Sequence, residues 1–229
     1  MINTLSIDAP DGKMEMILGV PEGAGPFPTL VVCHHRWGLD KFTESVVQRL
    51  NDNGFIAGAP RFFHRRPADE DTGESAKYLD DDQVIADARA ATAYLQKLPQ
   101  AKKGAEGIMG HCMGGRHSFL GPTGYPFKAA VMLYGGGVNH SRGGKPPALT
   151  RAARIGCPIL GFFGKEDKNP SPADMAEIDK ELTRLGKKHE FHAYDGAAHA
   201  FQNFTDERYR PEASEDAWRR YLAFFRETL

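Results

Sequence analysis

The stretch Gly110-His111-Cys112-Met113-Gly114-Gly115 decides the fold prediction, because it places a cysteine in a G-x-C-x-G turn. In such a turn the nucleophile lies at a strained strand-to-helix corner, where glycines avoid a collision between a Cβ and the neighbouring backbone. A helix N-terminus at this point would favour the thiolate of Cys112 and any oxyanion formed beside it. The pattern predicts a nucleophile elbow, although a glycine-rich turn around a buried structural cysteine has the same short signature.

Two later residues complete a possible catalytic set. Asp167 follows the apolar run 159–163, and His199 follows the run that ends at Tyr194. The resulting order of cysteine, aspartate and histidine is the order in which α/β-hydrolases supply nucleophile, acid and base, whereas chymotrypsin-like and subtilisin-like enzymes use other orders. We therefore predict a Cys112-Asp167-His199 triad. The alternatives are a turn-forming Asp167 and a surface His199 that caps a helix.

Strand-like and helix-like segments alternate along the whole chain. We expect strands at 13–20, 28–33, 55–60, 107–109, 129–134, 158–163 and 190–194, and helices at 42–53, 80–98, 173–185 and 214–227. This alternation predicts an α/β fold with a mostly parallel central sheet, flanked by helices on both faces, and with functional residues at the carboxyl ends of the strands. A chain of 229 residues is long enough for one sizeable core, so residues 1–229 are predicted to form a single domain.

Several motifs together resemble those of the dienelactone hydrolase family, from about Lys13 onward. They are Gly110-x-Cys112-x-Gly114-Gly115, Gly164-x-x-Asp167, Gly196-x-x-His199-x-Phe201 and the C-terminal segment 217–225. The resemblance implies an α/β-hydrolase fold, a Cys-His-Asp triad, and carboxymethylenebutenolidase-like cleavage of small lactones or activated esters. Substrates of this family typically carry a carboxylate. The resemblance implies no metal and no organic cofactor.

The sequence departs from the family after the strand at 28–33. The run Cys33-His34-His35-Arg36-Trp37-Gly38 stands where the family carries Gln-Glu-x-aromatic-Gly, so His35 replaces a glutamate that contacts the resting thiol. An imidazole there could take the thiol proton, stabilise a thiolate, or donate to a substrate carboxylate or carbonyl. It could also satisfy only a backbone carbonyl. We expect His34 to point to the opposite face and to be structural.

The same resemblance suggests the oxyanion site and part of the substrate site. It implies that the backbone N–H groups of Met113 and Arg36 bind the oxyanion. Trp37 is a candidate for the wall of the substrate site, or else a core residue. Tyr134, which precedes a run of three glycines, is a candidate for orienting substrate, and a core position is again the alternative.

The sequence does not single out one residue that would bind a substrate carboxylate. The loop that starts at Arg61 contains three arginines, and we expect Arg61, Arg65 or Arg66 to bind a carboxylate, with at least two of them only solvated. The family's arginine after the catalytic histidine has no counterpart here. Asn203 lies in that region and offers neutral hydrogen bonds instead.

Composition excludes several classes of partner. The chain carries 29 Lys and Arg against 30 Asp and Glu, so no overall charge favours nucleic acid or an anionic membrane. No segment approaches eighteen apolar residues, and no secretory signal opens the chain. The three cysteines form no CxxC pair. We expect a cytoplasmic protein that acts on a small molecule as a monomer or homodimer.

These observations predict a hydrolase in which the Cys112 thiolate forms a thioester acyl-enzyme that water then cleaves. Three alternatives remain open: a non-catalytic small-molecule-binding protein of the same fold, a carboxylesterase or thioesterase with another substrate class, and a redox thiol. A metal site built on His34, His35 and His64 is disfavoured, because adjacent histidines on a strand point to opposite faces.

Overall fold

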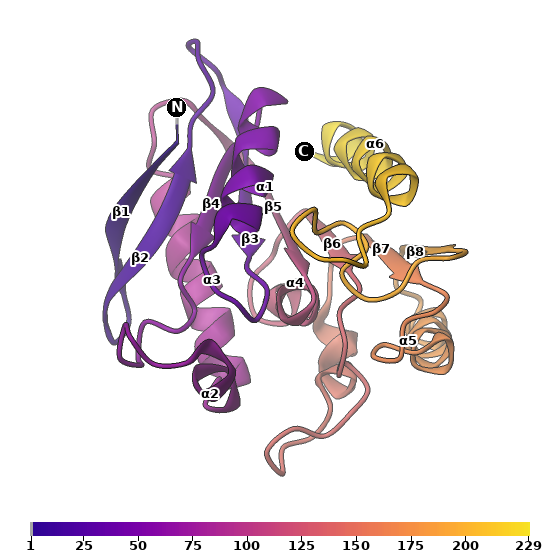
Figure 1. The fold of residues 1–229 in the computed structure, drawn as a ribbon. Coiled ribbons are helices and arrows are strands. Elements are labelled where there is room, and N and C mark those ends of the chain that lie inside the picture. The colour runs from indigo at the N-terminus through magenta and orange to yellow at the C-terminus, as the bar shows by residue number, and fades with distance from the viewer. Residues whose placement is uncertain (1) are drawn as a thin grey trace.

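A computed structural model describes residues 2–229 of the chain, and these residues form an α/β sandwich around one sheet (Figure 1). The eight strands run in the order β1-β2-β4-β3-β5-β6-β7-β8. The strands β3 to β8 pair in parallel, while β1 and β2 are antiparallel to their neighbours. Their bounds are β1 Ile2–Ala9, β2 Gly12–Gly19, β3 Phe27–Cys33, β4 Ile56–Pro60, β5 Ala101–His111, β6 Ala129–Leu133, β7 Ile159–Gly164 and β8 His189–Tyr194.

Helices cover both faces of the sheet. The α-helices are α1 Lys41–Asp52, α2 Thr72–Lys77, α3 Asp81–Leu95, α4 Met113–Leu120, α5 Pro172–Arg184 and α6 Pro211–Thr228. Short 3-10 segments span Gly121–Thr123 and Ala148–Arg154. Apolar side chains of α1 and α6 pack in one core layer, and those of α3, α4 and α5 pack in the other. The central strands β3 and β6 are therefore buried from both sides, as parallel strands usually are.

Local sequence signals explain where the helices nearest the site begin. Asp40 precedes α1, and its carboxylate accepts the backbone N–H of Thr43 at 2.9 Å. Asp80 caps α3 in the same manner through the N–H groups of Asp82 and Gln83. Each cap satisfies donors that a helix N-terminus leaves unpaired. The cap at Asp40 also fixes the chain that leaves β3, next to the elbow.

The predicted fold class is confirmed, and most predicted segments lie within a few residues of the observed ones. Two elements are absent from the prediction, β1 and α2, because β1 exposes half of its residues and α2 has only 6 residues. The predicted helix at 80–98 ends earlier, at Leu95, and β5 extends back to Ala101. Among residues 2–229, no helix has the length and apolar character needed to cross a membrane.

Candidate active site

The elbow forms at the carboxyl end of β5, where Cys112 precedes α4 with φ 56° and ψ −120°. A non-glycine residue rarely adopts a positive φ, so the backbone at Cys112 is strained. A Cβ on Gly110 would lie 2.1 Å from the carbonyl oxygen of Gly114, and a Cβ on Gly114 would lie 2.0 Å from that of Cys33. Both glycines are therefore required for α4 to pack this closely on the sheet.

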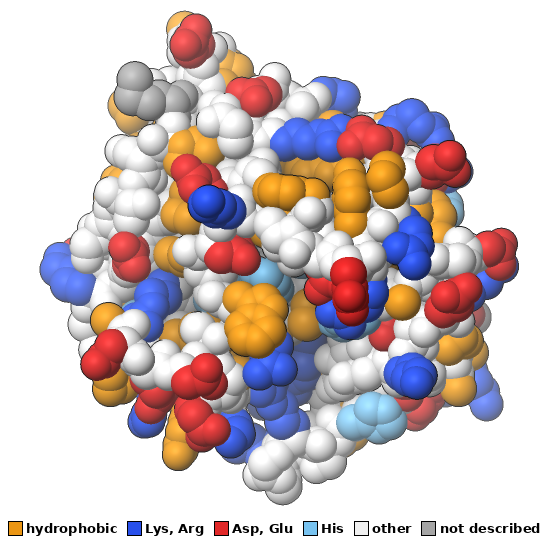
Figure 2. All heavy atoms as spheres, in the orientation of Figure 1, with side chains coloured by type: hydrophobic (Ala, Val, Ile, Leu, Met, Phe, Trp, Pro, Cys, Tyr) orange, Lys and Arg blue, Asp and Glu red, His pale blue; other side chains and the backbone are white. Residues whose placement is uncertain are grey.

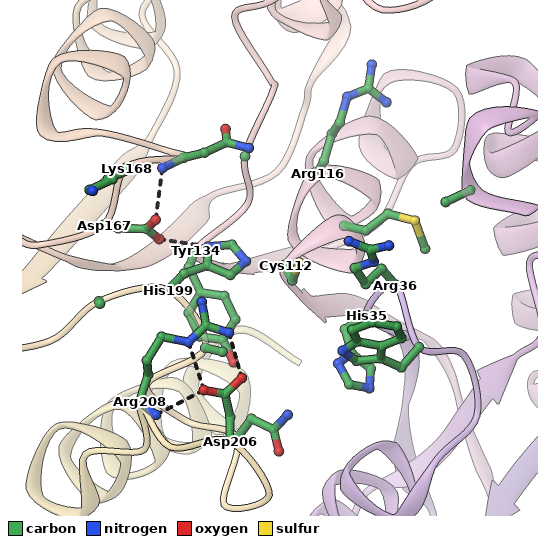
Figure 3. A pocket seen from close by; sticks show the side chains of 18 of the residues that line it. His35, Arg36, Cys112, Arg116, Tyr134, Asp167, Lys168, His199, Asp206 and Arg208 are labelled. Atoms are coloured by element: carbon green, nitrogen blue, oxygen red, sulfur yellow. Dashed lines mark hydrogen bonds and ion pairs between the residues drawn. The ribbon is translucent and has the colours of Figure 1, made fainter. Parts of the chain in front are cut away.

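Asp167 and His199 lie beside this cysteine, as the sequence predicts. Asp167 is buried in the loop after β7, and its Oδ2 lies 2.8 Å from Nδ1 of His199. The backbone N–H of Asn169 donates to the other carboxylate oxygen at 2.9 Å. His199, which follows β8, lies beside Cys112 (Figure 3), and because its Nδ1 contacts Asp167, Nε2 is the ring nitrogen left for the thiol.

The two titrating groups at the centre of this site favour a charged pair. Burial opposes ionisation of the Cys112 thiol, but the hydrogen bond and charge of His199 outweigh it and lower the pKa of Cys112. Burial likewise disfavours charge on His199, yet the interactions of its ring N–H groups with Asp167 and Cys112 raise the pKa of His199 to about 10. The arrangement therefore stabilises the thiolate and the imidazolium against their neutral forms.

Two backbone N–H groups also meet the sulfur of Cys112. They belong to Met113 and Arg36, the residues expected to bind an oxyanion, and both lower the pKa of the thiol. Met113 opens α4, and Arg36 lies just after β3. Donors from two neighbouring strand ends thus act on the same thiol, beside which a tetrahedral oxyanion would form.

A cavity of about 870 Å³ opens in front of the cysteine. Figure 3 shows Cys112 between His199 and Tyr134 on one side and His35 and Arg36 on the other. Trp37 and Phe204 are exposed by 55% and 52%. Trp37 lines the cavity, so it belongs to the rim of the site and not to the core.

Three other predicted substrate residues also line this cavity. Tyr134 is fully buried, and its ring meets the His199 ring edge-on with centroids 5.2 Å apart. His35 is buried, with Nε2 2.9 Å from Oδ2 of Asp40, although this contact lies off the direction of the N–H bond. Asn203 is buried in the wall, where its side-chain oxygen accepts the N–H of Thr205 at 3.0 Å.

Of the arginines predicted as candidates for binding a substrate carboxylate, Arg61 does not line the cavity. Its backbone N–H still donates to Glu15 in β2 at 2.8 Å, so the chain runs along the sheet at this point. The other two arginines of the loop are neutralised. Arg65 binds Asp87 through two nitrogens at 2.7 and 2.9 Å, and Arg66 donates to Glu70 at 2.8 Å.

The structure places different basic residues in the cavity, and sequence reasoning missed them. Arg142 reaches the site from the loop after β6 and donates to the carbonyl oxygen of Ala76 in α2. Arg116 on α4 is buried and binds the Asp81 carboxylate at 2.6 and 3.0 Å. The only local signal for Arg142 is its position in a glycine-rich loop after a predicted strand.

The histidines of the disfavoured metal site are engaged elsewhere. His34 bonds backbone groups of His35 and Phe62, while Nε2 of His64 lies 3.2 Å from Oδ2 of Asp87. Within the described chain, no group of three or more His, Cys, Asp or Glu side chains has the arrangement of a metal site.

Comparison with known proteins identifies the family. The model of the dienelactone hydrolase family matches residues 14–229. The chain belongs to this family. A Synechocystis protein named "Putative carboxymethylenebutenolidase" is 30% identical over 243 residues, which cover 100% of this chain and 98% of the relative. A Bradyrhizobium protein named "Probable 2-oxo-3-(5-oxofuran-2-ylidene)propanoate lactonase" is 29% identical and covers 91% of this chain and 87% of its own length.

Solved structures agree with this assignment. A crystal structure from Klebsiella pneumoniae described as "Putative Dienelactone Hydrolase" has a TM-score of 0.88 at 27% identity, and covers 98% of both chains. A dienelactone hydrolase-like phosphotriesterase from metagenomic libraries has a TM-score of 0.82 at 23% identity, which supports the fold alone. The chain is thus a dienelactone hydrolase-like hydrolase with the α/β-hydrolase fold.

Proposed function

We propose that this protein hydrolyses small anionic lactones or activated esters through a thioester on Cys112. The observation that carries the proposal is the strained elbow that holds Cys112 in one cavity with His199 and Asp167, where His199 and two backbone N–H groups lower the pKa of the thiol. The Asp167 carboxylate lies 2.8 Å from Nδ1 of His199 and orients the ring. A thiolate paired with an imidazolium and facing two oxyanion donors has the parts that acyl transfer needs.

The reaction divides between these groups. The Cys112 thiolate attacks the substrate carbonyl carbon, and the N–H groups of Met113 and Arg36 receive the negative charge that moves to the oxygen. When the carbon–oxygen bond to the leaving group breaks, protonated His199 gives its proton to the leaving oxygen, and a thioester remains. Neutral His199 then takes a proton from water, whose oxygen attacks the thioester. Release of the acid product restores the thiolate and the protonated His199.

Unpaired positive charge in the cavity supports an anionic substrate. Figure 2 shows Lys and Arg side chains in a hollow of the surface, and the cavity lining includes Arg36, Arg116 and Arg142. Asp81 neutralises only Arg116, and within residues 2–229 no carboxylate forms an ion pair with Arg36 or Arg142. Burial, and then the charge of Arg116, lower the pKa of Arg142, so a bound anion would relieve an uncompensated cation.

An apolar rim accompanies this charge. The Arg36 guanidinium lies over the Trp37 ring at 4.6 Å, and the exposed ring of Phe204 packs against Phe42 with centroids 6.3 Å apart. A small substrate with a planar apolar body and a carboxylate matches both features. The names of the two relatives, a butenolidase and a lactonase, describe substrates of this kind for those proteins.

A hydrolysis screen tests the proposal. Lactones and activated aryl esters, each in a carboxylate form and a neutral form of equal size, are assayed with the parent protein and with Cys112→Ala. We expect turnover of the anionic forms that Cys112→Ala abolishes. The proposal fails if no lactone or ester is turned over, or if folded Cys112→Ala keeps near-parental rates.

The charge preference has its own matched pair of variants. Arg142→Gln should lower kcat/KM for the anionic substrate about 10- to 100-fold and leave the neutral substrate nearly unchanged, because one buried charged hydrogen bond is lost. Arg61→Gln is the control, since Arg61 does not line the cavity. Equal effects of the two substitutions would remove Arg142 from the substrate site.

A further inference from the structure

One peptide group carries one of the two backbone N–H donors that act on the Cys112 thiol. It joins His35 to Arg36, and its N–H lowers the pKa of that thiol. Its carbonyl oxygen, on His35, accepts two hydrogen bonds at the opposite end. One comes from the backbone N–H of Gly38 at 3.1 Å, and the other is a 2.6 Å contact with Nδ1 of His34.

The second ring nitrogen of His34 is also engaged, by the chain that follows β4. The backbone N–H of Phe62 donates to Nε2 of His34 at 3.1 Å. A backbone N–H can only donate and a carbonyl can only accept, so Nε2 must be free of a proton and Nδ1 must carry one. Only the neutral Nδ1–H form of His34 satisfies both partners.

The surroundings of His34 hold it in this state. The side chain is 1% exposed and lies between the rings of Phe62 and Phe63, at centroid distances of 5.5 and 4.9 Å. Burial lowers the pKa of His34 to about 4, so the ring stays neutral at physiological pH. The charges of His35 and Arg61 also lower this pKa and that of Asp40 raises it, each by less than burial does.

We propose that His34 is a positioning residue for the oxyanion site, which rests on the function proposed above. It links the His35–Arg36 peptide to the segment after β4 and so fixes the direction of the Arg36 N–H. Donation to the His35 carbonyl also polarises this peptide, which strengthens its N–H as a donor. The effect is exerted only through the peptide, because His34 does not line the cavity.

Two substitutions of matched severity separate positioning from packing. His34→Asn can keep an N–H donor near the Nδ1 position but loses the acceptor for Phe62. His34→Gln can keep an acceptor near the Nε2 position but loses the short donor to His35. Each leaves one backbone group unpaired, so the two variants should lose similar stability, which thermal melting measures.

We expect His34→Gln to lower kcat about 10- to 100-fold with little change in KM, and His34→Asn to stay within about threefold of the parent. The loss in His34→Gln is smaller than the roughly 10²- to 10³-fold expected for removal of an oxyanion donor, because the Gly38 N–H still holds the peptide. Alkylation of Cys112 by iodoacetamide forms no oxyanion and needs only the thiolate, which His199 stabilises more than the Arg36 N–H does. Its rate at pH 7.5 should stay within about threefold in both variants.

The kcat values and melting temperatures of the two His34 variants together decide whether His34 positions the peptide. Equal kcat values for the two variants, or losses that follow melting temperature, would overturn the role of His34. If His34→Asn melts far below His34→Gln yet keeps the higher kcat, the inference stands more firmly. Failure of the parent to hydrolyse any ester, or full activity of Cys112→Ala, would instead refute the proposed function. The parent and Cys112→Ala alone give that result, so it is independent of the His34 variants.

Discussion

The two sides of Cys112 each contain a histidine, and one of the two is neutral while the other is positively charged. On the side of β3, His34 bonds a backbone N–H and a backbone carbonyl, and burial lowers its pKa to about 4. On the side of β7 and β8, His199 bonds the Asp167 carboxylate and the Cys112 sulfur, and its pKa rises to about 10 although burial again opposes its charge.

The difference shows that the hydrogen-bonding partners decide whether a buried histidine carries a second proton. Dipoles of fixed polarity select a neutral tautomer, while two anionic partners select the imidazolium. The β3 side therefore supplies geometry, through a peptide held in place. The β7–β8 side supplies the charge and the proton. The His199 and Asp167 variants test the β7–β8 side, and the His34 and His35 variants test the β3 side. A failed prediction on one side therefore does not contradict the account of the other.

The largest expected effect comes from breaking the charged side. His199→Ala and Asp167→Asn should each lower kcat/KM by about 10³-fold or more without unfolding the protein, because proton transfer and ring orientation are lost together. Steady-state kinetics on variants with parental melting curves would measure this. Parental rates in either folded variant would remove that residue from the mechanism.

A smaller effect concerns the thiol itself. The pKa of Cys112 is lowered, so its thiolate persists below the pH of about 8.5 at which free cysteine ionises. Iodoacetamide should thus alkylate Cys112 rapidly at pH 7, and His199→Ala should move the midpoint of the rate–pH curve upward by one unit or more, because burial then acts without its opposing partner.

Cys33 and Cys157 are the internal controls for that curve. Burial raises the pKa of both thiols, that of Cys157 to about 11, so both should react slowly at pH 7. Peptide mapping after partial alkylation assigns the label. Equal labelling of all three cysteines, or an unchanged midpoint in His199→Ala, would contradict a thiolate–imidazolium pair.

The smallest effect is expected at His35, which lies on the β3 side and lines the cavity beside Asp40. His35→Glu exchanges an imidazole for an anion and restores the residue usual in the family. It should change kcat/KM a few-fold, shift its pH dependence and alter the ranking of anionic against neutral lactones. If His35→Glu and His35→Ala both keep the parental pH profile and ranking, His35 is only a buried strand-end residue.

The sequence could predict the residues whose positions follow from local pattern. Cys112, Asp167 and His199 each follow a strand-like run, and the carboxyl ends of parallel strands meet at one edge. Arg61 and Arg142 could not be placed in this way. The position of Arg61 depends on the pairing of β4 with β2, and that of Arg142 on a loop that crosses to Ala76 in α2. Such long-range contacts have no periodic signal in the chain.

The central claim is that substrate is held as a thioester on Cys112, and trapping that species tests it most directly. An activated ester is mixed with the protein, and the reaction is quenched in acid within its first turnovers. The mass of the intact protein is then measured, and peptide mapping locates any added mass. The account predicts an added acyl mass on the peptide that contains Cys112, removable by hydroxylamine and absent from Cys112→Ala. Turnover with no acyl adduct at any time point, or an adduct on another residue, would contradict it.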